Sequence, residues 1–198
     1  MPLPLPPDFD LILASKSPRR SQLLTQAGIP FRIRTKEVEE DYPEDLAARD
    51  VAPFLARKKA LACADYLEND QQILLTADSV VILNDRIYGK PEDREDAIRI
   101  ISELSGNVHT VVTGVCLLSK RREEVFSGIS DVYFRKLSGD EITYYVDKYQ
   151  PFDKAGAYAI QEWIGLCKIH RIDGTYDNIM GLPVDLVYEK LTDGGWRG

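Results

Sequence analysis

The sequence is poor in the residues from which disulfide frameworks and zinc sites are built. Its 198 residues include only three cysteines and two histidines. Cys63, Cys116 and Cys167 stand far apart and cannot all be paired, which argues against a disulfide framework and for a reducing compartment. There is no C-x-x-C pair, and His109 and His170 lie near apolar strand-like runs. We therefore expect no structural zinc site, and expect both histidines to be structural or surface residues.

Long apolar runs and a surplus of positive charge are also absent. No run approaches the roughly 20 apolar residues of a membrane span, and the first residues, MPLPLPPDFD, lack the cationic region of a signal peptide. The formal net charge is −7, which disfavours binding to a nucleic acid polymer but leaves room for a small anionic ligand. We expect a protein that binds neither membrane nor nucleic acid polymer, with flexible ends at about residues 1–8 and 193–198.

Three common nucleotide and hydrolase motifs are missing as well. The sequence contains no G-x-x-x-x-G-K-[ST] phosphate loop, no G-x-G-x-x-G and no G-x-S-x-G elbow. A phosphate-loop nucleotidase, a Rossmann dehydrogenase and an α/β-hydrolase are therefore all disfavoured.

Apolar periodicity and capping signals predict a mixture of helices and strands. Helices are expected at residues 17–27, 46–68 (with Pro53 as a potential break), 92–104, 138–149 and 184–191. Strands are expected at residues 11–14, 31–34, 73–83, 108–118, 125–135 and 166–172. The pair Asn84-Asp85 is a turn signal, and Ser138 with Glu141 forms a capping box. These signals predict an α/β fold with a mixed twisted sheet in a single domain over residues 1–198.

The stretch ASKSPRRSQLL places two arginines where a strand is expected to turn into a helix. Ser17 is a natural N-cap and Pro18 a natural first helical residue. Free N–H groups at a helix start favour phosphate. Ser15 and Ser17 could add hydroxyl donors, and Arg19 and Arg20 could add guanidinium donors. The alternative is a capped surface helix with two solvated arginines, and the motif alone favours that alternative.

Two further motifs place single charges in unusual positions. Asp78, in ILLTADSVVIL, lies inside an apolar strand, where burial is costly unless the carboxylate is paired or binds a metal. This favours a metal ligand or general base over an Asp at a strand break. Lys90, in YGKPED, is a cation at a predicted helix start, where an anion would resolve the conflict with the dipole. A solvated lysine is an equally good interpretation.

The remaining candidates are weak when taken singly. Gln161, in QPFDKAGAYAIQ, carries an amide that suits the edge of a base, although a strand with a tight crossing explains the small residues. Glu39 and Glu40 in an acidic loop, and Lys59 in RKKA, are most often solvated charges. In combination, they are carboxylates for a hard cation and lysines for phosphate, as a triphosphate-cleaving site requires.

These motifs follow one another along nearly the whole chain, from about residue 11 to 188. In order, the strings are LASKSPRR, the Glu-Glu pair, LARKKA, TADSVVIL, GKPED, LSGNVHTVVTGV, FDKAGAYAIQ and IDGTYDNIMGLP. Together they resemble the Maf family of nucleoside triphosphate pyrophosphatases. The resemblance implies an α/β, ITPase-like fold with two lobes flanking a central cleft, and a cytoplasmic, frequently dimeric enzyme. It also implies hydrolysis of the α–β phosphoanhydride of a nucleotide with Mg²⁺ or Mn²⁺ as cofactor.

The resemblance also implies a role for each matching residue. Asp78 matches the proton acceptor, and Glu40 a second acid that shares a metal with it. Lys59 and Lys90 match phosphate-binding lysines. Ser15, Arg19 and Arg20 match the anion site at the helix start, and Arg19, Ser79 and Gln161 match positions linked to substrate choice. The string DKAGAYAIQ looks like the branch acting on dTTP and UTP, so the resemblance implies a nucleotide diphosphatase with a nucleoside triphosphate as its partner.

Three positions depart from the family's usual pattern. Ser79 replaces a usual Thr, Tyr149-Gln150 replaces a common Gly-Glu pair, and Ile179 replaces a usual Val. The change at Tyr149-Gln150 removes one carboxylate and adds a ring near the entrance, which puts fine base preference in question.

Two other interpretations stay open. The rival hypothesis is a nucleotide-binding regulator of cell division with catalysis secondary. A third is that the cations are scattered over the surface and no cleft exists.

Overall fold

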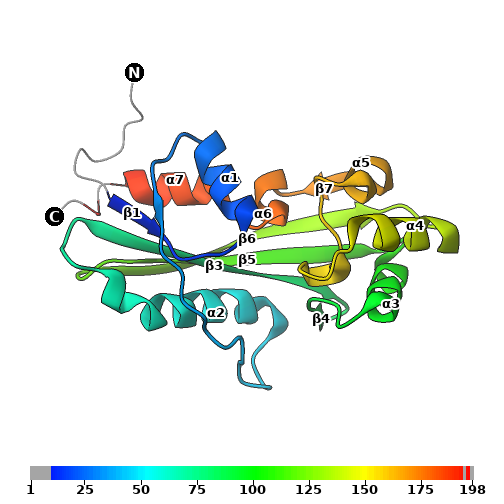
Figure 1. The fold of residues 1–198 in the computed structure, drawn as a ribbon, viewed down its shortest axis with the longest axis horizontal. Helices are drawn as coiled ribbons and strands as arrows, with labels where there is room; N and C mark the ends of the chain where they lie inside the picture. The colour runs from blue at the N-terminus through cyan, green and yellow to red at the C-terminus, as the bar shows by residue number, and fades with distance from the viewer. Residues whose placement is uncertain (1–9, 194, 197–198) are drawn as a thin grey trace. The chain divides into compact units, whose positions relative to one another are not determined.

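The computed structural model describes residues 10–193 and 195–196, and in this part of the chain helices and strands are mixed, as predicted (Figure 1). The strands are β1 (Asp10–Leu13), β2 (Arg32–Ile33), β3 (Gln72–Leu83), β4 (Arg86–Tyr88), β5 (Val108–Leu118), β6 (Glu123–Phe134) and β7 (Ile169–Asp173). The α-helices are α1 (Pro18–Gln26), α2 (Ala48–Ala62), α3 (Arg94–Leu104), α4 (Gly139–Tyr149), α5 (Trp163–Lys168), α6 (Tyr176–Met180) and α7 (Val184–Thr192). Two single turns of 3₁₀ helix are η1 (Ala64–Tyr66) and η2 (Ala155–Ala157).

The seven strands of the described chain form one mixed sheet. Its order is β2-β1-β3-β5-β6-β7, and β4 pairs with β3. The pairs β1/β2 and β1/β3 are parallel, whereas β3/β4 and β6/β7 are antiparallel. Asn84 and Asp85 form the turn between β3 and β4 with φ of 51° and 60°, as a two-residue hairpin requires. The predicted α/β class with a mixed sheet is confirmed.

The described chain divides into two compact units, and three of the strands contribute residues to both. Unit 1 comprises residues 10–78, Thr113–Gly128 and the chain from Gly181 onward. Unit 2 comprises Ser79–Val112 and Ile129–Met180.

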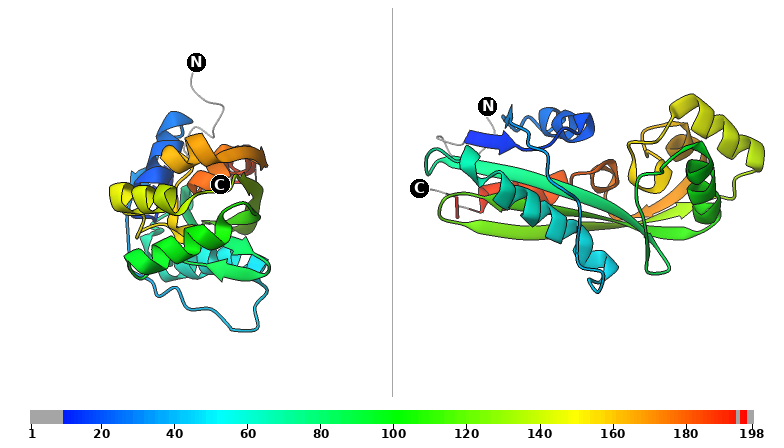
Figure 2. Two further views of the ribbon diagram at one scale, coloured as in Figure 1. Left: turned by 90° about the vertical axis from the view of Figure 1, so that its right-hand side faces the viewer. Right: turned by 60° about the horizontal axis from the view of Figure 1, so that its bottom comes forward.

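Unit 1 is a sheet covered by helices on both faces. Figure 1 and both views of Figure 2 show α2 along one face and α1 with α7 along the other. Ile12 and Leu74, from neighbouring strands, pack with Ala56, Ala60 and Cys116 in a buried cluster. Because β3 is covered on both faces, 11 of its 12 residues are buried, which explains its continuous apolar run.

Unit 2 has its own core, in which α3 and α4 pack beside each other. Ile101, Leu104, Val132 and Tyr145 are among its fully buried residues. The capping box that begins α4 is present as predicted: the Ser138 hydroxyl accepts from the Glu141 N–H, and the Glu141 carboxylate accepts from the Ser138 N–H. This box fixes where α4 begins, and so fixes which face of the helix is buried.

Pro53 does not break α2, which runs without interruption from Ala48 to Ala62. The helix survives because its apolar face, including Val51, Leu55 and Ala60, is buried on the sheet, and this packing outweighs the backbone hydrogen bond that a proline removes. The helix ends six residues before the predicted position 68, and η1 follows it.

Three other predictions about helices and strands were wrong. Helix α3 begins at Arg94 rather than at residue 92, because the Asp93 carboxylate caps it by accepting from the Asp96 N–H at 2.8 Å. Residues 166–168, predicted as strand, belong to α5. The predicted loop DGTYDNIMGLP contains α6, whose short length left no periodic signal to find.

Several expectations from composition can be compared with the structure. Cys63, Cys116 and Cys167 are all free, as expected without a disulfide framework. None of the helices in the described chain is long and apolar enough to cross a bilayer. The expected flexible residues 1–8 lie outside the described residues, as do 194, 197 and 198 of the expected flexible C-terminal end. Trp196, by contrast, is buried, and its indole N–H donates to the Lys190 carbonyl at 2.8 Å.

Candidate functional site

The start of α1 has the geometry that the sequence predicted, but not the hydroxyl cap. Ser17 occupies the N-cap position and Pro18 follows it, yet the Ser17 side chain makes no capping hydrogen bond. Instead its backbone N–H donates to the Ser15 hydroxyl oxygen at 3.2 Å. No acidic residue lies in the first turn, so α1 itself supplies no carboxylate to the positive end of its dipole.

Arg20 is held by the protein rather than pointing freely into solvent. Its Nε donates to the Gly181 carbonyl at 2.8 Å, and its Nη1 donates to the Ser15 hydroxyl at 3.2 Å. Burial lowers the pKa of Arg20, while the nearby carboxylates of Asp78 and Glu40 act in the opposite direction. An arginine stays protonated under such a shift, so Arg20 brings a fixed positive charge toward these two acids. Arg19, beside it on α1, is partly buried.

Lys59 joins the two predicted acids of unit 1. Its Nζ lies 2.6 Å from Asp78 Oδ1 and 2.7 Å from Glu40 Oε1. Asp78 is only 8% exposed on β3, Lys59 lies on α2, and Glu40 lies in the loop before that helix. The loop and β3 therefore each bring one carboxylate to the ammonium group on α2. We call Arg20, Glu40, Lys59 and Asp78 the charge cluster.

The position of Lys59 follows from how α2 is attached to the sheet. The buried Thr76 hydroxyl donates to the Ala56 carbonyl at 2.7 Å, and side chains two apart on a strand share a face. Asp78 therefore leaves β3 on the same face as Thr76, toward the helix that carries Lys59. A Cβ at Gly114 would lie 2.2 Å from the Pro53 backbone nitrogen, so β5 and α2 touch backbone to backbone.

Sequence reasoning missed both of these positioning residues. Thr76 reads as an ordinary β-branched strand residue, and nothing in its neighbourhood marks it as a hydrogen-bond donor to a helix. Gly114 gave a usable signal, because a glycine inside the β-rich run HTVVTGV suggests close approach of another backbone. The partner in that approach, the helix around Pro53, could not be identified from the sequence.

The donor set of the charge cluster fits a divalent cation. Asp78 and Glu40 direct one oxygen each toward a single positively charged atom, and Mg²⁺ is commonly held by one or two carboxylates, with water and phosphate oxygens completing its coordination. Among the described residues, no group of three or more His, Cys, Asp or Glu side chains is arranged to hold a metal by itself. Any metal here would need oxygens from a ligand.

Unit 2 carries the other predicted residues: Ser79, Lys90 and Gln161. Ser79 follows Asp78 directly on β3, so its side chain leaves the strand on the other face. Lys90 is exposed just after β4. The carbonyl of its neighbour Gly89 accepts from the Gly156 N–H at 3.0 Å, which joins the Lys90 segment to the segment that leads to Gln161.

Gly156 allows this close approach in unit 2. Its φ is +70°, and a Cβ there would lie 2.8 Å from a methyl carbon of Val81. A larger residue would be strained by its backbone conformation as well as by this contact. The small residues of DKAGAYAIQ therefore pack a backbone against β3 and β4, as the sequence indicated for a tight crossing.

Gln161 lies in a tight turn and has an unused acceptor. The Glu162 N–H donates to the Ala159 carbonyl at 3.1 Å, which closes the turn around Ile160 and Gln161. The side-chain Oε1 of Gln161 is buried and accepts no hydrogen bond from the described residues. An unsatisfied buried acceptor costs about 1–3 kcal/mol, so an atom of this kind indicates a place for a donor from a ligand.

The two histidines have the structural and surface positions that we expected. His109 is 1% exposed, its Nε2 lies 2.8 Å from the Tyr158 hydroxyl, and burial lowers its pKa to about 3. His170 is exposed on β7. Neither residue lies in the charge cluster.

The chain is similar to known proteins over nearly its whole length. The family model "Maf-like protein" matches residues 10–194. The dTTP/UTP pyrophosphatase of Bacteroides thetaiotaomicron is 46% identical over 184 residues, which cover 92% of this chain and 95% of that protein. The dTTP/UTP pyrophosphatase of Porphyromonas gingivalis strain W83 is 46% identical over 189 residues, covering 94% and 95%.

A solved structure shows the same fold at low sequence identity. The Staphylococcus aureus Ham1 protein aligns with a TM-score of 0.53 and 17% identity, over 92% of this chain and 97% of that one. This likeness concerns the fold alone. The family model and the relatives at 46% identity extend over nearly the whole chain, and the chain therefore belongs to the Maf family.

Proposed function

We propose that the protein hydrolyses dTTP and UTP to the nucleoside monophosphate and pyrophosphate. In this reaction a water oxygen bonds to the α-phosphorus, the bond from that phosphorus to the α–β bridging oxygen breaks, and pyrophosphate leaves. The observation that carries the proposal is the contact of Lys59 with both Asp78 and Glu40, with Arg20 nearby. The names of the relatives support dTTP and UTP as substrates.

Each residue of the charge cluster has a role in this proposal. Asp78 accepts the proton of the attacking water, since a carboxylate on a rigid strand meets the positional demand on a general base. Lys59 and Arg20, with Arg19, Ser15 and Ser17 at the start of α1, bind phosphate oxygens and stabilise their developing charge.

The proposed cofactor is Mg²⁺ or Mn²⁺, held by Asp78 and Glu40. When bound, such a cation neutralises triphosphate charge and orients the phosphates. Lys59 also contacts both acids, so its ammonium group offsets part of their negative charge.

For three residues of unit 2 we propose the substrate-binding roles that the sequence predicted. Lys90 binds phosphate as a point charge, and Ser79 is proposed to contribute to substrate choice. Gln161 offers its unpartnered amide oxygen to a donor on the base, such as the N3–H that thymine and uracil share. We further propose that the protein is a cytoplasmic homodimer that binds neither membrane nor nucleic acid polymer.

A panel assay tests the function. The purified protein is incubated with dTTP, UTP, dCTP, dATP and dGTP, with and without Mg²⁺, and pyrophosphate and monophosphate are measured. We expect equimolar release of both products from dTTP and UTP, only in the presence of the cation. Nucleoside diphosphate and inorganic phosphate as products, or no turnover of any triphosphate, would refute the proposal. A regulator with catalysis secondary predicts binding without turnover, and the names of the relatives do not favour it.

A further inference from the structure

One buried hydroxyl holds both ends of the turn that carries Gln161. Tyr145 lies on the inner face of α4 and is fully buried. Its hydroxyl accepts from the Ala159 N–H at 3.1 Å and donates to the Glu162 carboxylate. Ala159 and Glu162 are the first and last residues of the turn, so a single side chain from another element is tied to both ends.

The protonation state of Tyr145 suits this double role. Burial raises the pKa of the Tyr145 hydroxyl, and the hydrogen bond to Glu162 raises it further. The hydroxyl therefore keeps its proton at physiological pH and serves as a donor to the carboxylate and an acceptor from the backbone. A charge-assisted hydrogen bond of this kind is stronger than one between neutral groups.

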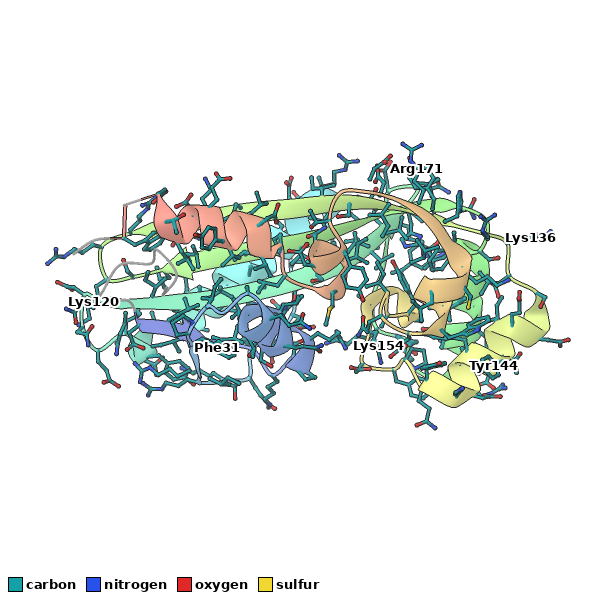
Figure 3. The ribbon with its side chains drawn as sticks, turned by 90° about the horizontal axis from the view of Figure 1, so that it is seen from above. Phe31, Lys120, Lys136, Tyr144, Lys154 and Arg171 are labelled. Atoms are coloured by element: carbon teal, nitrogen blue, oxygen red, sulfur yellow. The ribbon has the colours of Figure 1, made fainter. Side chains whose placement is uncertain are left out.

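The rest of the turn is held just as closely. A Cβ at Gly165 would lie 1.8 Å from the Ile160 carbonyl oxygen, so the backbone of α5 packs directly on the middle of the turn. Lys154 Nζ lies 3.6 Å from Glu162 Oε1 and bonds the neighbouring Asp153 at 2.7 Å. Figure 3 labels Lys154 in the segment that follows α4.

A second aromatic ring lies against the ring that carries this hydroxyl. The Tyr149 ring stacks on the Tyr145 ring, with centroids 5.0 Å apart and planes 23° apart. The stacked ring restricts the Tyr145 side chain from the side of the helix end, and adds to the restraint on its hydroxyl.

We propose that Tyr145 is a positioning residue for base selection, which fixes the direction of the Gln161 amide by bracing the turn at residues 159–162, and that Tyr149 supports it. The reason is the contrast within the turn. The backbone at both ends of the turn and the Glu162 carboxylate are hydrogen-bonded, while the Gln161 Oε1 that the turn presents has no partner among the described residues. A hydrogen bond selects a base only if its acceptor is held in place before binding. The inference rests on the proposed function.

The test compares two tyrosine variants at neighbouring positions of α4. Tyr145→Phe removes only the bracing hydroxyl and keeps the ring that stacks on Tyr149. Tyr144→Phe is the matched control, because the Tyr144 side chain is 45% exposed and its hydroxyl accepts only from Lys148 among the hydrogen bonds described for it. Figure 3 labels Tyr144 on α4. The ratio of kcat/KM for dTTP to that for dATP is measured for the parent and both variants.

We expect the dTTP-to-dATP ratio to fall about tenfold in Tyr145→Phe, through a higher KM for dTTP with kcat nearly unchanged, and to stay at the parent value in Tyr144→Phe. Glu162→Gln, whose amide oxygen can still accept from Tyr145, should keep most of the selectivity. If Tyr145→Phe lowers kcat/KM equally for dTTP and dATP, or changes neither, the ratio stays at the parent value and the inference is wrong.

The test also distinguishes a variant that fails to fold from a parent protein that has no activity. If Tyr145→Phe shows no cooperative unfolding transition, Glu162→Ala removes the same tie from the more exposed side, and an unchanged ratio there overturns the inference. If the parent protein itself turns over no triphosphate, the proposed function fails, and with it the premise of this proposal. An active parent with an unaffected Tyr145→Phe variant leaves the function standing and removes only the role of Tyr145.

Discussion

The two units of the chain hold their candidate residues in different ways. In unit 1, charged side chains contact one another: Lys59 reaches Asp78 and Glu40, and Arg20 carries a positive charge nearby. In unit 2, the segments around Lys90 and Gln161 are fixed by backbone and hydroxyl hydrogen bonds, and the Gln161 amide oxygen is left without a partner in the described chain.

This difference suggests a division of labour. A fixed cluster of cations and carboxylates can stabilise charge that develops on phosphate oxygens, which suits chemistry on phosphates. A neutral acceptor held in a rigid turn gives little binding energy but rejects ligands that lack the matching donor. We therefore assign rate to the charge cluster and base selection to the Gln161 turn, and each prediction below tests one side of that assignment.

The largest effect is expected at Asp78. Asp78→Asn keeps the size of the side chain but removes its basicity, so we expect a loss of about 10²–10⁴-fold in kcat for dTTP, while nucleotide binding measured by calorimetry persists. Asp85→Asn is the control, because Asp85 lies in the exposed β3–β4 turn with a φ of 60° that asparagine also adopts. Parent-like turnover in Asp78→Asn would exclude it as the proton acceptor.

The elements of the fold could be predicted where local pattern decides the structure. The residues 108–118 predicted for β5 are those observed, and the Ser138 box fixed the start of α4. Local pattern failed where distant contacts decide. Pro53 predicted a break that burial against β5 prevents, and the short helices α5 and α6 have too few residues for a period to emerge.

The candidate site could be predicted as a set of residue types, but not as a set of contacts. The buried position of Asp78 followed from its apolar neighbours, and the structure gives it the paired cation that burial demands. That Lys59 would be this cation could not be read from the sequence, because it depends on Thr76 and Gly114 docking α2 on the sheet. Tyr145 was missed for the same reason. The positioning role proposed for it depends on hydrogen bonds to Ala159 and Glu162, which stand 14 and 17 positions later in the chain.

A smaller effect, on stability, is expected from the neutral interior of unit 2. His109 has a folded-state pKa of about 3 against an ordinary value of 6.5, so between these values the unfolded chain binds the extra proton. The contribution of His109 to the free energy of unfolding is therefore fully present above about pH 6.5. It falls as the pH drops toward 3, and the free energy of unfolding then decreases by up to about 1.4 kcal/mol per pH unit.

His109→Gln measures this contribution, because an amide can still bond the Tyr158 hydroxyl but does not titrate. Urea unfolding is followed from pH 7.5 to pH 4.5, and the free energy of unfolding of the variant should fall less steeply than that of the parent. His170→Gln, at an exposed position on β7, should follow the parent curve. Parallel curves for the parent and His109→Gln would show that His109 does not titrate on unfolding.

The most direct test of the division of labour is the kcat/KM ratio of dTTP to dATP in Lys59→Ala and Gln161→Ala. Lys59→Ala should lower kcat/KM about a hundredfold for both dTTP and dATP and leave their ratio unchanged, because Lys59 acts on the phosphates that both substrates share. Gln161→Ala should lower the ratio about tenfold, mainly through dTTP. A changed ratio in Lys59→Ala, or an unchanged one in Gln161→Ala, would contradict the account.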